Sequence, residues 1–279
     1  MYPNSKLLAE GKTKRIHSVS DLDLVRIESK DDITAGDGAK HDVFEGKAEY
    51  STETTCNVFE LLDRHDIPSA FVKRCSKTEF LARRCEMLPF EVVIRGVAMG
   101  SFLKRNPEIE KGKALNPPLV EFYLKTSGRS FNSVTLPKDD PIITEFASTY
   151  VIVYDPSKPY GAGEGILVPI EKEDRGEEQC MSLRQAKELM ETTAHQVFLI
   201  LAVAWRRLGF TLADLKIEFG ITSDGRLVVA DVIDNDSWRV LTAEGVHLDK
   251  QRYRDGEGIE KVRDLYREMA DRSKMLLQY

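Results

Sequence analysis

The sequence predicts a fold that mixes α-helices and β-strands, with mainly antiparallel strands and one long helix. The first hundred residues contain several short apolar runs that alternate with polar residues, as strands do. Residues 183–208 repeat apolar side chains at helical spacing, between Ser182, a good helix N-cap, and Gly209, a typical helix end. Residues 215–239 contain two strand-like runs around an Asp-Gly turn signal, which indicates a hairpin.

The remaining elements follow from the same patterns, taken in chain order. Strands are expected at residues 13–19, 24–29, 70–75 and 90–98, and further helices at 48–65 and roughly 257–277. A short helical turn within residues 100–107 is stopped by Asn106-Pro107. Repeated prolines break residues 106–180, which we expect to pack as loops and short strands over the main sheet. No Ser- or Gly-rich linker is visible, so independent domains are not expected.

Composition limits the classes of function. The 279 residues are 31% charged and 42% hydrophobic, as in soluble globular proteins. The formal net charge of −6 argues against a general nucleic-acid binder. The four cysteines show no zinc-ligand spacing, so we expect buried reduced thiols and a cytoplasmic location. The N-terminus lacks the apolar core of a signal peptide, and the longest apolar run, residues 197–205, is too short to span a membrane.

Two carboxylates in the hairpin raise the first question about function. If Asp224 and Gly225 are the two turn residues, Glu218 lies directly opposite Asp231, whereas a three-residue bulged loop would shift this register. One face is then apolar and buried, with Leu215, Ile217, Phe219, Val228, Ala230 and Val232. The other face carries Lys216 and both carboxylates, and opposed like charges destabilise a sheet. Either Lys216 compensates on a solvated surface, or a metal such as Mg²⁺ binds the carboxylates beside nucleotide phosphates.

Basic residues near the N-terminus suggest a phosphate site. Lys12 and Lys14 alternate on a predicted strand, so both ammonium groups project from one face, and Gly11 allows a ligand close to the backbone. The segment is not a P-loop, because Lys6 stands where that motif needs a glycine. Two solvated lysines on an exposed strand are the alternative interpretation. Asp37, in an acidic Gly-containing loop, either contacts a ligand or stabilises its turn.

A second basic group surrounds Arg95, which interrupts an apolar strand and, if buried, needs an anion. Gly100 and Ser101 open a short helical turn that offers a hydroxyl and backbone N–H groups to a phosphate. A structural salt bridge and an ordinary helix cap explain the same residues equally well. Arg239 follows Asp231 closely in the chain, so its side chain can reach the same cleft as the Asp231 carboxylate. A late run of mixed charge forms either an anion clamp or a solvated loop, with Lys250, Arg252 and Arg254.

No spacing of serine, histidine or cysteine indicates a protein nucleophile. The predicted chemistry is therefore electrostatic positioning of phosphates and carboxylates, with help from a metal.

Six motifs in order resemble one family closely: "EGKTK", "SKDDITAGDG", "RGVAMGSFLKRNP", "LADLKIEFG", "VVADVIDNDSWR" and "DKQRYRD". The chain resembles the phosphoribosylaminoimidazole-succinocarboxamide synthase (SAICAR synthetase) family, nearest the version that forms the N-terminal half of the animal bifunctional enzyme. The resemblance covers about residues 7–140 and 180–277. Residues 142–178 depart from the family's short segment. The length leaves no room for the carboxylase half, so we expect a monofunctional enzyme or an excised domain.

The resemblance implies an ATP-grasp-like α+β fold of two lobes, with a β-rich nucleotide lobe at residues 1–90 and a lobe for ribotide and metal at 91–279. It implies a ligase that uses ATP to phosphorylate the carboxylate of carboxyaminoimidazole ribotide (CAIR) and then joins it to L-aspartate in purine biosynthesis. The implied ligands are ATP, Mg²⁺, CAIR and L-aspartate. Neither a nucleic acid nor a membrane partner is expected, and a homo-oligomer stays open.

The resemblance also implies a role for each matched residue. The ATP site would contain Lys12, Lys14, Met87, Lys216, Glu218 and Asp231, with Met87 beside adenine and with Glu218 and Asp231 on Mg²⁺. The ribotide site would contain Asp37, Arg95, Ser101, Arg239, Arg252 and Arg254. Catalytic roles would fall to Lys216, Arg95 and Asp231. A kinase-like enzyme with another acceptor and an inactive binding module are the alternatives, and the ribotide residues argue for a phosphorylated, carboxylated small molecule.

Overall fold

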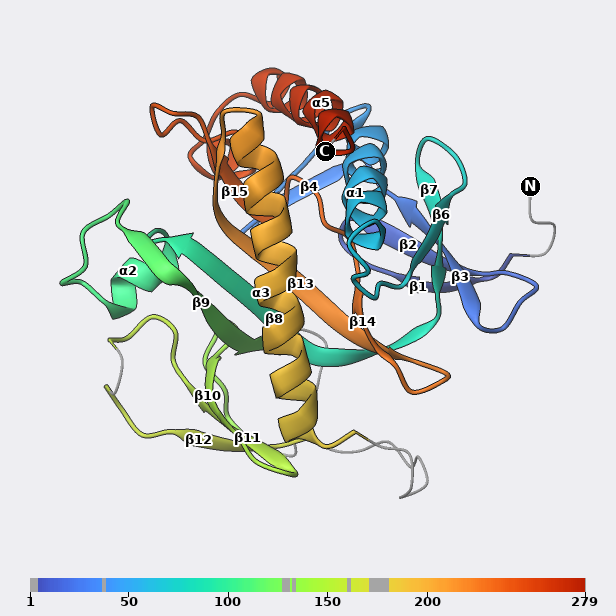
Figure 1. The fold of residues 1–279 in the computed structure, drawn as a ribbon. Helices are drawn as coiled ribbons and strands as arrows, with labels where there is room; N and C mark the ends of the chain where they lie inside the picture. Colours follow the sequence, from blue (N-terminus) through green and yellow to red (C-terminus); the bar gives the residue numbers. More distant parts are fainter. Residues whose placement is uncertain are drawn as a thin grey trace.

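A computed structural model describes residues 5–36, 39–126, 131, 134–159, 162–170 and 181–278 of the chain, and Figure 1 shows its fold. The strands are β1 (Leu7–Glu10), β2 (Lys14–Ser18), β3 (Leu24–Ser29), β4 (Asp32–Ala35), β5 (Lys40–Val43), β6 (Phe71–Arg74), β7 (Glu79–Arg83), β8 (Cys85–Val97), β9 (Ala114–Leu124), β10 (Ile142–Phe146), β11 (Tyr150–Tyr154), β12 (Ile166–Pro169), β13 (Thr211–Thr222), β14 (Leu227–Ala230) and β15 (Trp238–Leu241). The helices are α1 (Lys47–Asp63), α2 (Ser101–Arg105), α3 (Leu183–Arg207), α4 (Gln251–Arg254) and α5 (Ile259–Leu276).

The strands form three sheets. A five-stranded sheet has the order β1-β2-β3-β7-β6, and β4 pairs with β5. An eight-stranded sheet has the order β12-β11-β10-β9-β8-β13-β14, with β15 also paired to β13. Every pairing between these strands is antiparallel, which confirms the predicted α+β class with mainly antiparallel sheets.

The long helix α3 covers one face of the eight-stranded sheet, where it crosses β8 and β13 (Figure 1). Its N-terminus is a capping box, in which the Ser182 side chain and Gln185 bond each other's backbone N–H groups. Gly209 follows its end at φ +85°, a conformation that favours glycine. Trp205 is fully buried against Trp238, with ring centroids 5.4 Å apart. The predicted helix over 183–208, its cap and its core stripe are confirmed.

Helices from opposite ends of the chain lie side by side. Figure 1 shows α1 against α5, and Asn57 of α1 donates to the Ser273 hydroxyl of α5 at 2.8 Å. The five-stranded sheet ends at Arg83 and the eight-stranded sheet begins at Cys85. A division into lobes at about residue 90 stays a prediction, because α1 belongs to the first segment but packs against the last helix.

The proline-rich middle of the chain differs from expectation. We expected loops and short strands packed over the main sheet, but β9 to β12 extend that sheet at its edge. Pro117 and Pro118 lie within β9, in its exposed first half, while Phe122 and Leu124 in its second half are buried. The apolar residues of the second half therefore determine the pairing, which the prolines do not prevent.

The hairpin also differs, by one residue of register. Glu218 pairs with Ala230 and not with Asp231, because the loop has three residues, 223–225, with Gly225 at φ +80°. A shift of one residue moves every side chain of one strand to the other face. Phe219 therefore shares the main core with Val229, whereas we expected it to share a face with Val228 and Ala230. Those two side chains instead join a second apolar cluster with Val25, Ile27 and Phe80.

Three smaller expectations need correction or stay open. Lys12 precedes β2, which begins at Lys14, so the two lysines do not alternate on one strand. Cys56 is buried, but Cys75 is exposed, so the expectation of buried thiols is wrong for Cys75. Cys180 lies outside the described residues.

In the part of the chain that the structure describes, no helix has the length and apolar character that a membrane crossing requires.

Candidate functional site

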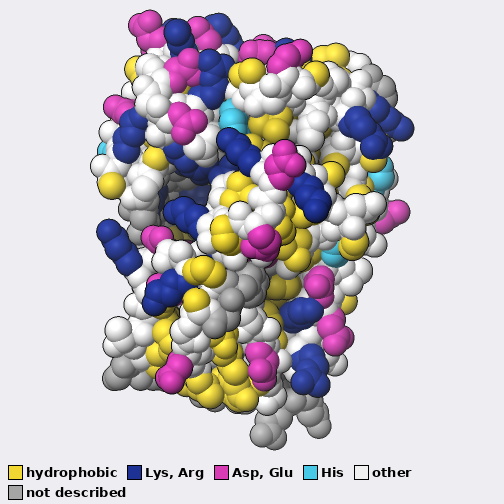
Figure 2. Space-filling view, turned by 90° about the vertical axis from the view of Figure 1, so that its left-hand side faces the viewer, with side chains coloured by type: hydrophobic (Ala, Val, Ile, Leu, Met, Phe, Trp, Pro, Cys, Tyr) yellow, Lys and Arg dark blue, Asp and Glu magenta, His cyan; other side chains and the backbone are white. Residues whose placement is uncertain are grey.

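A cavity of about 450 Å³ opens on the face of the eight-stranded sheet that points away from α3. Figure 2 shows lysine and arginine side chains gathered around a hollow in this part of the surface. Residues of β8 and β13 form its floor. The cavity is strongly polar, which distinguishes it from a binding site for an apolar ligand.

Strand alternation explains how the floor is built. The cavity is lined from β8 by Glu91, Val93 and Arg95, and from β13 by Asp214, Lys216, Ile217 and Glu218. Apart from Ile217, each set contains every second residue of its strand, so the other six side chains point to one face. The register pairs them row by row, as Glu91 with Glu218, Val93 with Lys216, and Arg95 with Asp214. The odd-numbered neighbours on β13, such as Leu215 and Ile217, belong to the main core on the other face.

Each of three carboxylates in the wall contacts a lysine. The pairs are Lys216 with Glu91 at 2.8 Å, Lys125 with Glu218 at 2.6 Å, and Lys14 with Asp231. Burial raises the pKa of Glu218, but the nearby ammonium groups, with Lys125 foremost, hold it below its ordinary value. Burial lowers the pKa of Lys14 to about 8, with Glu218 opposing this shift and Lys125 adding to it. Glu218 is therefore ionised at neutral pH, and a phosphate or metal that enters meets side chains of both signs.

Asp231 has an unusual backbone. It follows β14 directly and adopts φ +64°, a left-handed conformation that aspartate and asparagine tolerate better than most side chains. One carboxylate oxygen accepts the N–H of Val232 at 2.7 Å and also contacts Lys14. This conformation removes Asp231 from the strand ladder and lets its side chain line the cavity beside Glu218. The two carboxylates that the sequence placed face to face thus line the same cavity through a turn of the chain and not through strand pairing.

A second cavity, of about 390 Å³, adjoins the first and shares Lys14, Glu218 and Asp231 with it. The rest of its wall is largely apolar, with Val25, Ile27, Phe80, Ala82, Met87 and Ala230. Met87 lies on β8 opposite Gly220 of β13. A Cβ atom added at Gly220 would stand 2.6 Å from the Cβ of Cys85, so the two strands leave no room there for a side chain. An apolar slot that ends in lysines suits a nucleotide, because the base is flat and weakly polar whereas the phosphates are anionic.

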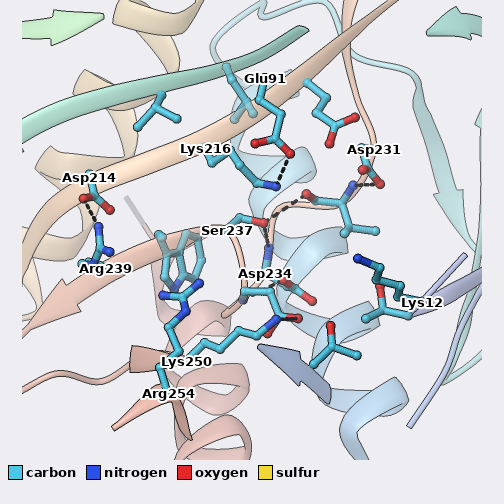
Figure 3. A pocket seen from close by; sticks show the side chains of 18 of the residues that line it. Lys12, Glu91, Asp214, Lys216, Asp231, Asp234, Ser237, Arg239, Lys250 and Arg254 are labelled. Atoms are coloured by element: carbon cyan, nitrogen blue, oxygen red, sulfur yellow. Dashed lines mark hydrogen bonds and ion pairs between the residues drawn. The ribbon is translucent and has the colours of Figure 1, made fainter. Parts of the chain in front are cut away.

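Arg95 and Arg239 form the other end of the first cavity. Arg95 is 3% exposed and donates to Glu121 at 2.7 Å, to Asp214 at 3.3 Å and to the Ser101 hydroxyl at 3.2 Å. Arg239 donates to the same oxygen of Asp214. Arg95 therefore has the structural salt bridge that the sequence left open, and it also lines the cavity. Figure 3 shows Asp214 and Arg239 at one end, Asp231 and Lys12 at the other, and Lys216 between them.

An acid–base cluster that is largely buried lines another side of the cavity. Asp236 contacts Lys47 at 3.5 Å, Lys250 at 3.0 Å and the Tyr266 hydroxyl. Burial raises the pKa of Asp236, but the two lysines outweigh it and keep the pKa below its ordinary value. Lys47 is 1% exposed at the start of α1, so this cluster fastens that helix to the cavity wall.

The structure brings most of the predicted residues together. The first cavity is lined by Lys12, Lys14, Arg95, Ser101, Lys216, Glu218, Asp231, Arg239 and Arg254, and the second by Met87. Arg252 lies away from both cavities and pairs with Glu257, so its position gives its expected role no support. Asp37 lies outside the described residues.

Sequence reasoning missed four residues of the walls, Glu91, Lys125, Asp214 and Asp234, and also Lys47, which contacts the wall residue Asp236. The sequence could have predicted Asp214, because this residue continues the alternation of Lys216 and Glu218 by one step along the strand. Lys47 and Lys125 carry no such signal, since their partners lie far away in the chain.

The carboxylates at the junction of the two cavities fit Mg²⁺ in one specific way. No group of three or more His, Cys, Asp or Glu side chains that could hold a metal occurs among the described residues. Glu218 and Asp231 supply two carboxylates where the cavities meet. Mg²⁺ typically binds one or two carboxylates together with substrate phosphates and water. The residues therefore suit a metal that binds with a nucleotide.

Comparisons with known proteins agree on one family. The model of the SAICAR synthetase family matches residues 7–137 and 169–273. The phosphoribosylaminoimidazole-succinocarboxamide synthase of Chloroflexus aurantiacus is 41% identical over 259 residues, which cover 92% of this chain and 89% of that protein. The bifunctional phosphoribosylaminoimidazole carboxylase/phosphoribosylaminoimidazole succinocarboxamide synthetase of Mus musculus is 35% identical, over 98% of this chain and 59% of that protein. Among solved structures, a SAICAR synthetase (Type-2) in complex with ADP has a TM-score of 0.73 at 30% identity, covering 95% of this chain and 96% of that one.

Proposed function

The chain belongs to the SAICAR synthetase family, and we propose that its two joined cavities bind ATP and carboxyaminoimidazole ribotide for coupling to L-aspartate. It is an ATP-dependent, amide-forming ligase of purine biosynthesis, as the six motifs predicted. The observation that carries the assignment of the cavities is their junction, where Lys14, Glu218 and Asp231 line both. A nucleotide whose base fills the apolar cavity delivers its phosphates to this junction.

The apolar cavity is the proposed site for the adenine end of ATP. Met87 and the apolar residues of β3, β7 and β14 supply surfaces for a planar base. Lys12, Lys14 and Lys216 line the charged cavity beyond it and would neutralise phosphate charge there. Positive charge aimed at a transferring phosphoryl group is the main contribution that a protein makes to this kind of transfer.

Mg²⁺ is proposed to bind Glu218 and Asp231 together with the phosphates of ATP, for the reasons of ligand chemistry given above. When bound, it would supply positive charge to the phosphate oxygens. Lys14 and Lys125 contact these two carboxylates in the structure and balance their charge.

The ribotide is proposed to bind at the arginine end, where Ser101, Arg239 and Arg254 present donors to an anion. Its carboxylate oxygen would attack the γ-phosphorus of ATP, the bond from that phosphorus to the bridging oxygen would break, and ADP would leave. The amine of L-aspartate would then attack the acyl carbon and release inorganic phosphate, with loss of a proton from nitrogen. Lys216 lies between the two ends of the cavity (Figure 3), which suits a cation that follows the transferred phosphoryl group.

An omission assay tests the proposed function. Purified protein is incubated with Mg-ATP, CAIR and L-aspartate, each is left out in turn, and release of ADP and formation of the amide are measured. We expect sustained ADP release only with all three components. Sustained release that does not depend on aspartate contradicts the ligase assignment, and release with a protein hydroxyl as acceptor would indicate a kinase.

The low pKa of Lys14 predicts a pH dependence for the use of ATP. A lysine with a pKa of about 8 is mainly charged at pH 7 and mainly neutral at pH 9. Because kcat/KM reports groups of the free enzyme, kcat/KM for ATP should fall as pH rises through about 8. The variant Lys14→Arg is the control, since a guanidinium stays charged over this range. An equal fall in both proteins would show that Lys14 is not the group that titrates.

A cytoplasmic location is proposed from the pattern of cysteines, and the oligomeric state stays open in the proposal. Fractionation of the source cells and light scattering of the purified protein measure these two properties directly.

A further inference from the structure

We propose that Asp214 is a positioning residue for the ribotide site, which holds the guanidinium groups of Arg95 and Arg239 in the geometry that binds an anion. This inference rests on the proposed function, because it assumes that the arginine end of the cavity binds the ribotide. Asp214 itself carries the wrong charge to contact an anion. Its place in the wall of an anion site therefore calls for a different role.

Strand pairing places Asp214 between the two arginines. On β13 it pairs with Arg95 of β8 on one side and with Arg239 of β15 on the other. Side chains of directly paired residues on one face of an antiparallel sheet are near neighbours. The sheet thus forms a row of arginine, aspartate and arginine across three strands, and Asp214 is its centre.

The hydrogen bonds show that one oxygen serves both partners. Nη1 of Arg95 donates to Oδ2 of Asp214 at 3.3 Å, and Nη1 of Arg239 donates to the same Oδ2. Asp214 is 5% exposed, so these bonds form largely out of contact with water. Charge-assisted bonds of this kind fix direction as well as position. Two long side chains that would otherwise sample many rotamers are therefore held against one carboxylate.

Gly100 limits Arg239 from the opposite side. A Cβ atom at this position would stand 2.8 Å from Nη2 and 3.0 Å from Nη1 of Arg239. Gly100 also has φ +59°, which favours glycine. The guanidinium of Arg239 is thus packed between the backbone at Gly100 and the carboxylate of Asp214, directly before Ser101.

Arg95 extends the effect to the hydroxyl of Ser101. Nη2 of Arg95 donates to Oγ of Ser101 at 3.2 Å, so this oxygen acts as an acceptor toward the protein. The hydroxyl hydrogen of Ser101 is then available to donate to a ligand. Through Arg95, Asp214 orients a neutral donor in addition to the positive charge of Arg239.

The variant Asp214→Asn tests the proposal, since it keeps the shape of the side chain and removes its charge. We expect the KM for CAIR to rise on the order of tenfold to a hundredfold, as small misplacements of substrate-positioning groups do. The KM for ATP should change less than about twofold, because the lysines at the other end are untouched. Calorimetry of CAIR binding without ATP should show the same loss, which measures the site without turnover.

A matched control removes a carboxylate from an arginine elsewhere. Glu53 contacts Arg74 at 2.8 Å and lines neither cavity. The variant Glu53→Gln should leave both KM values unchanged. The thermal midpoint of each variant is measured beside its kinetics, so that loss of folded protein is not mistaken for loss of binding.

A double-mutant cycle with Arg239→Gln separates a positioning role from an independent one. If Asp214 acts through its arginines, Asp214→Asn should raise the KM for CAIR less once Arg239 is replaced than it does in the wild type, because only the route through Arg95 remains. The double variant also removes both members of the Asp214–Arg239 pair, so it should fold even if the single aspartate variant does not.

Three results would overturn the proposal: an unchanged KM for CAIR in Asp214→Asn, an equal rise in the KM values for CAIR and ATP, or fully additive effects in the cycle. A wild-type protein that binds CAIR in the calorimeter but releases no ADP would instead contradict the proposed ligase activity.

Discussion

Replacement of Asp231 by asparagine is expected to lower kcat by at least about a hundredfold, the scale of losing one electrostatic group in a preorganised site. The carboxylate lines both cavities at their junction, where the phosphates of ATP and the metal are proposed to meet. Asparagine keeps the size of the side chain but loses the charge that attracts a cation.

The asparagine variant should keep its fold, which makes the result interpretable. The backbone of Asp231 has φ +64°, and asparagine tolerates this left-handed conformation as well as aspartate does. An alanine at the same position would add backbone strain to the loss of charge. We therefore expect a thermal midpoint close to that of the wild type together with the large loss of turnover.

The measurement is ADP release over a titration of Mg²⁺. If Asp231 binds the metal, the variant should need more Mg²⁺ to reach its reduced rate. Asp224→Asn is the control, because this aspartate lies in the exposed hairpin turn, where it pairs with Arg226. A near-normal rate of Asp231→Asn at ordinary Mg²⁺ would remove Asp231 from the proposed metal site.

The largest effect on stability is expected for Glu121→Gln. The Glu121 side chain is 1% exposed and contacts Arg95 at 2.7 Å and Arg105 at 2.5 Å. Removing one partner of a buried ion pair leaves uncompensated charge and costs about 3–5 kcal/mol. Because glutamine cannot balance two buried guanidinium groups, the free energy of unfolding should fall by about this amount. In a chain of this size, that loss lowers the thermal midpoint by roughly 10 °C.

The dependence on pH follows from the direction of the pKa shift. Burial raises the pKa of Glu121, but Arg95 and Arg105 outweigh it, so the folded-state pKa lies below its ordinary value. A carboxyl group of this kind contributes stability above its unfolded-state pKa, and the contribution is lost as pH falls through the folded-state pKa. The difference between wild type and variant should therefore be full at pH 7 and shrink in acid.

Thermal unfolding by circular dichroism at pH 7 and in acid measures both effects. Glu145→Gln is the control, because Glu145 is exposed on β10 of the same sheet and its loss should change stability by less than about 0.5 kcal/mol. If the thermal midpoint of Glu121→Gln lies within about 2 °C of the wild-type midpoint, the buried arginines have found other partners, and the prediction is wrong.

Local patterns of the sequence predicted the elements well. The boundaries of α3 differ from the prediction by one residue at most, because its capping box, its apolar stripe and Gly209 are all encoded nearby in the chain. The alternation along β13 likewise placed Lys216 and Glu218 on the face opposite the core. The ordered motifs identified the family, and the family match covers nearly the same ranges.

The hairpin shows that local sequence patterns do not determine the register between two strands. An Asp-Gly pair fits both a two-residue and a three-residue loop, and only the observed loop of residues 223–225 selects the register. That single residue of difference moves Ala230 into the wall of the apolar cavity. It also releases Asp231 from the ladder into a left-handed turn. Asp231 still lines the junction of the cavities with Glu218 despite the wrong register, and its role there stays a prediction.

The sequence by itself determined the class of the fold, the family and most of the charged residues that line the cavities. Only the tertiary structure decided which charges balance each other, because partners such as Asp214 and Arg239, or Lys47 and Asp236, come from segments that pairing and packing bring together. It also separated Arg254, which lines the cavity, from Arg252, which pairs with Glu257. Two arginines in one charged run look alike in sequence, whereas the direction of a side chain depends on its neighbours in space.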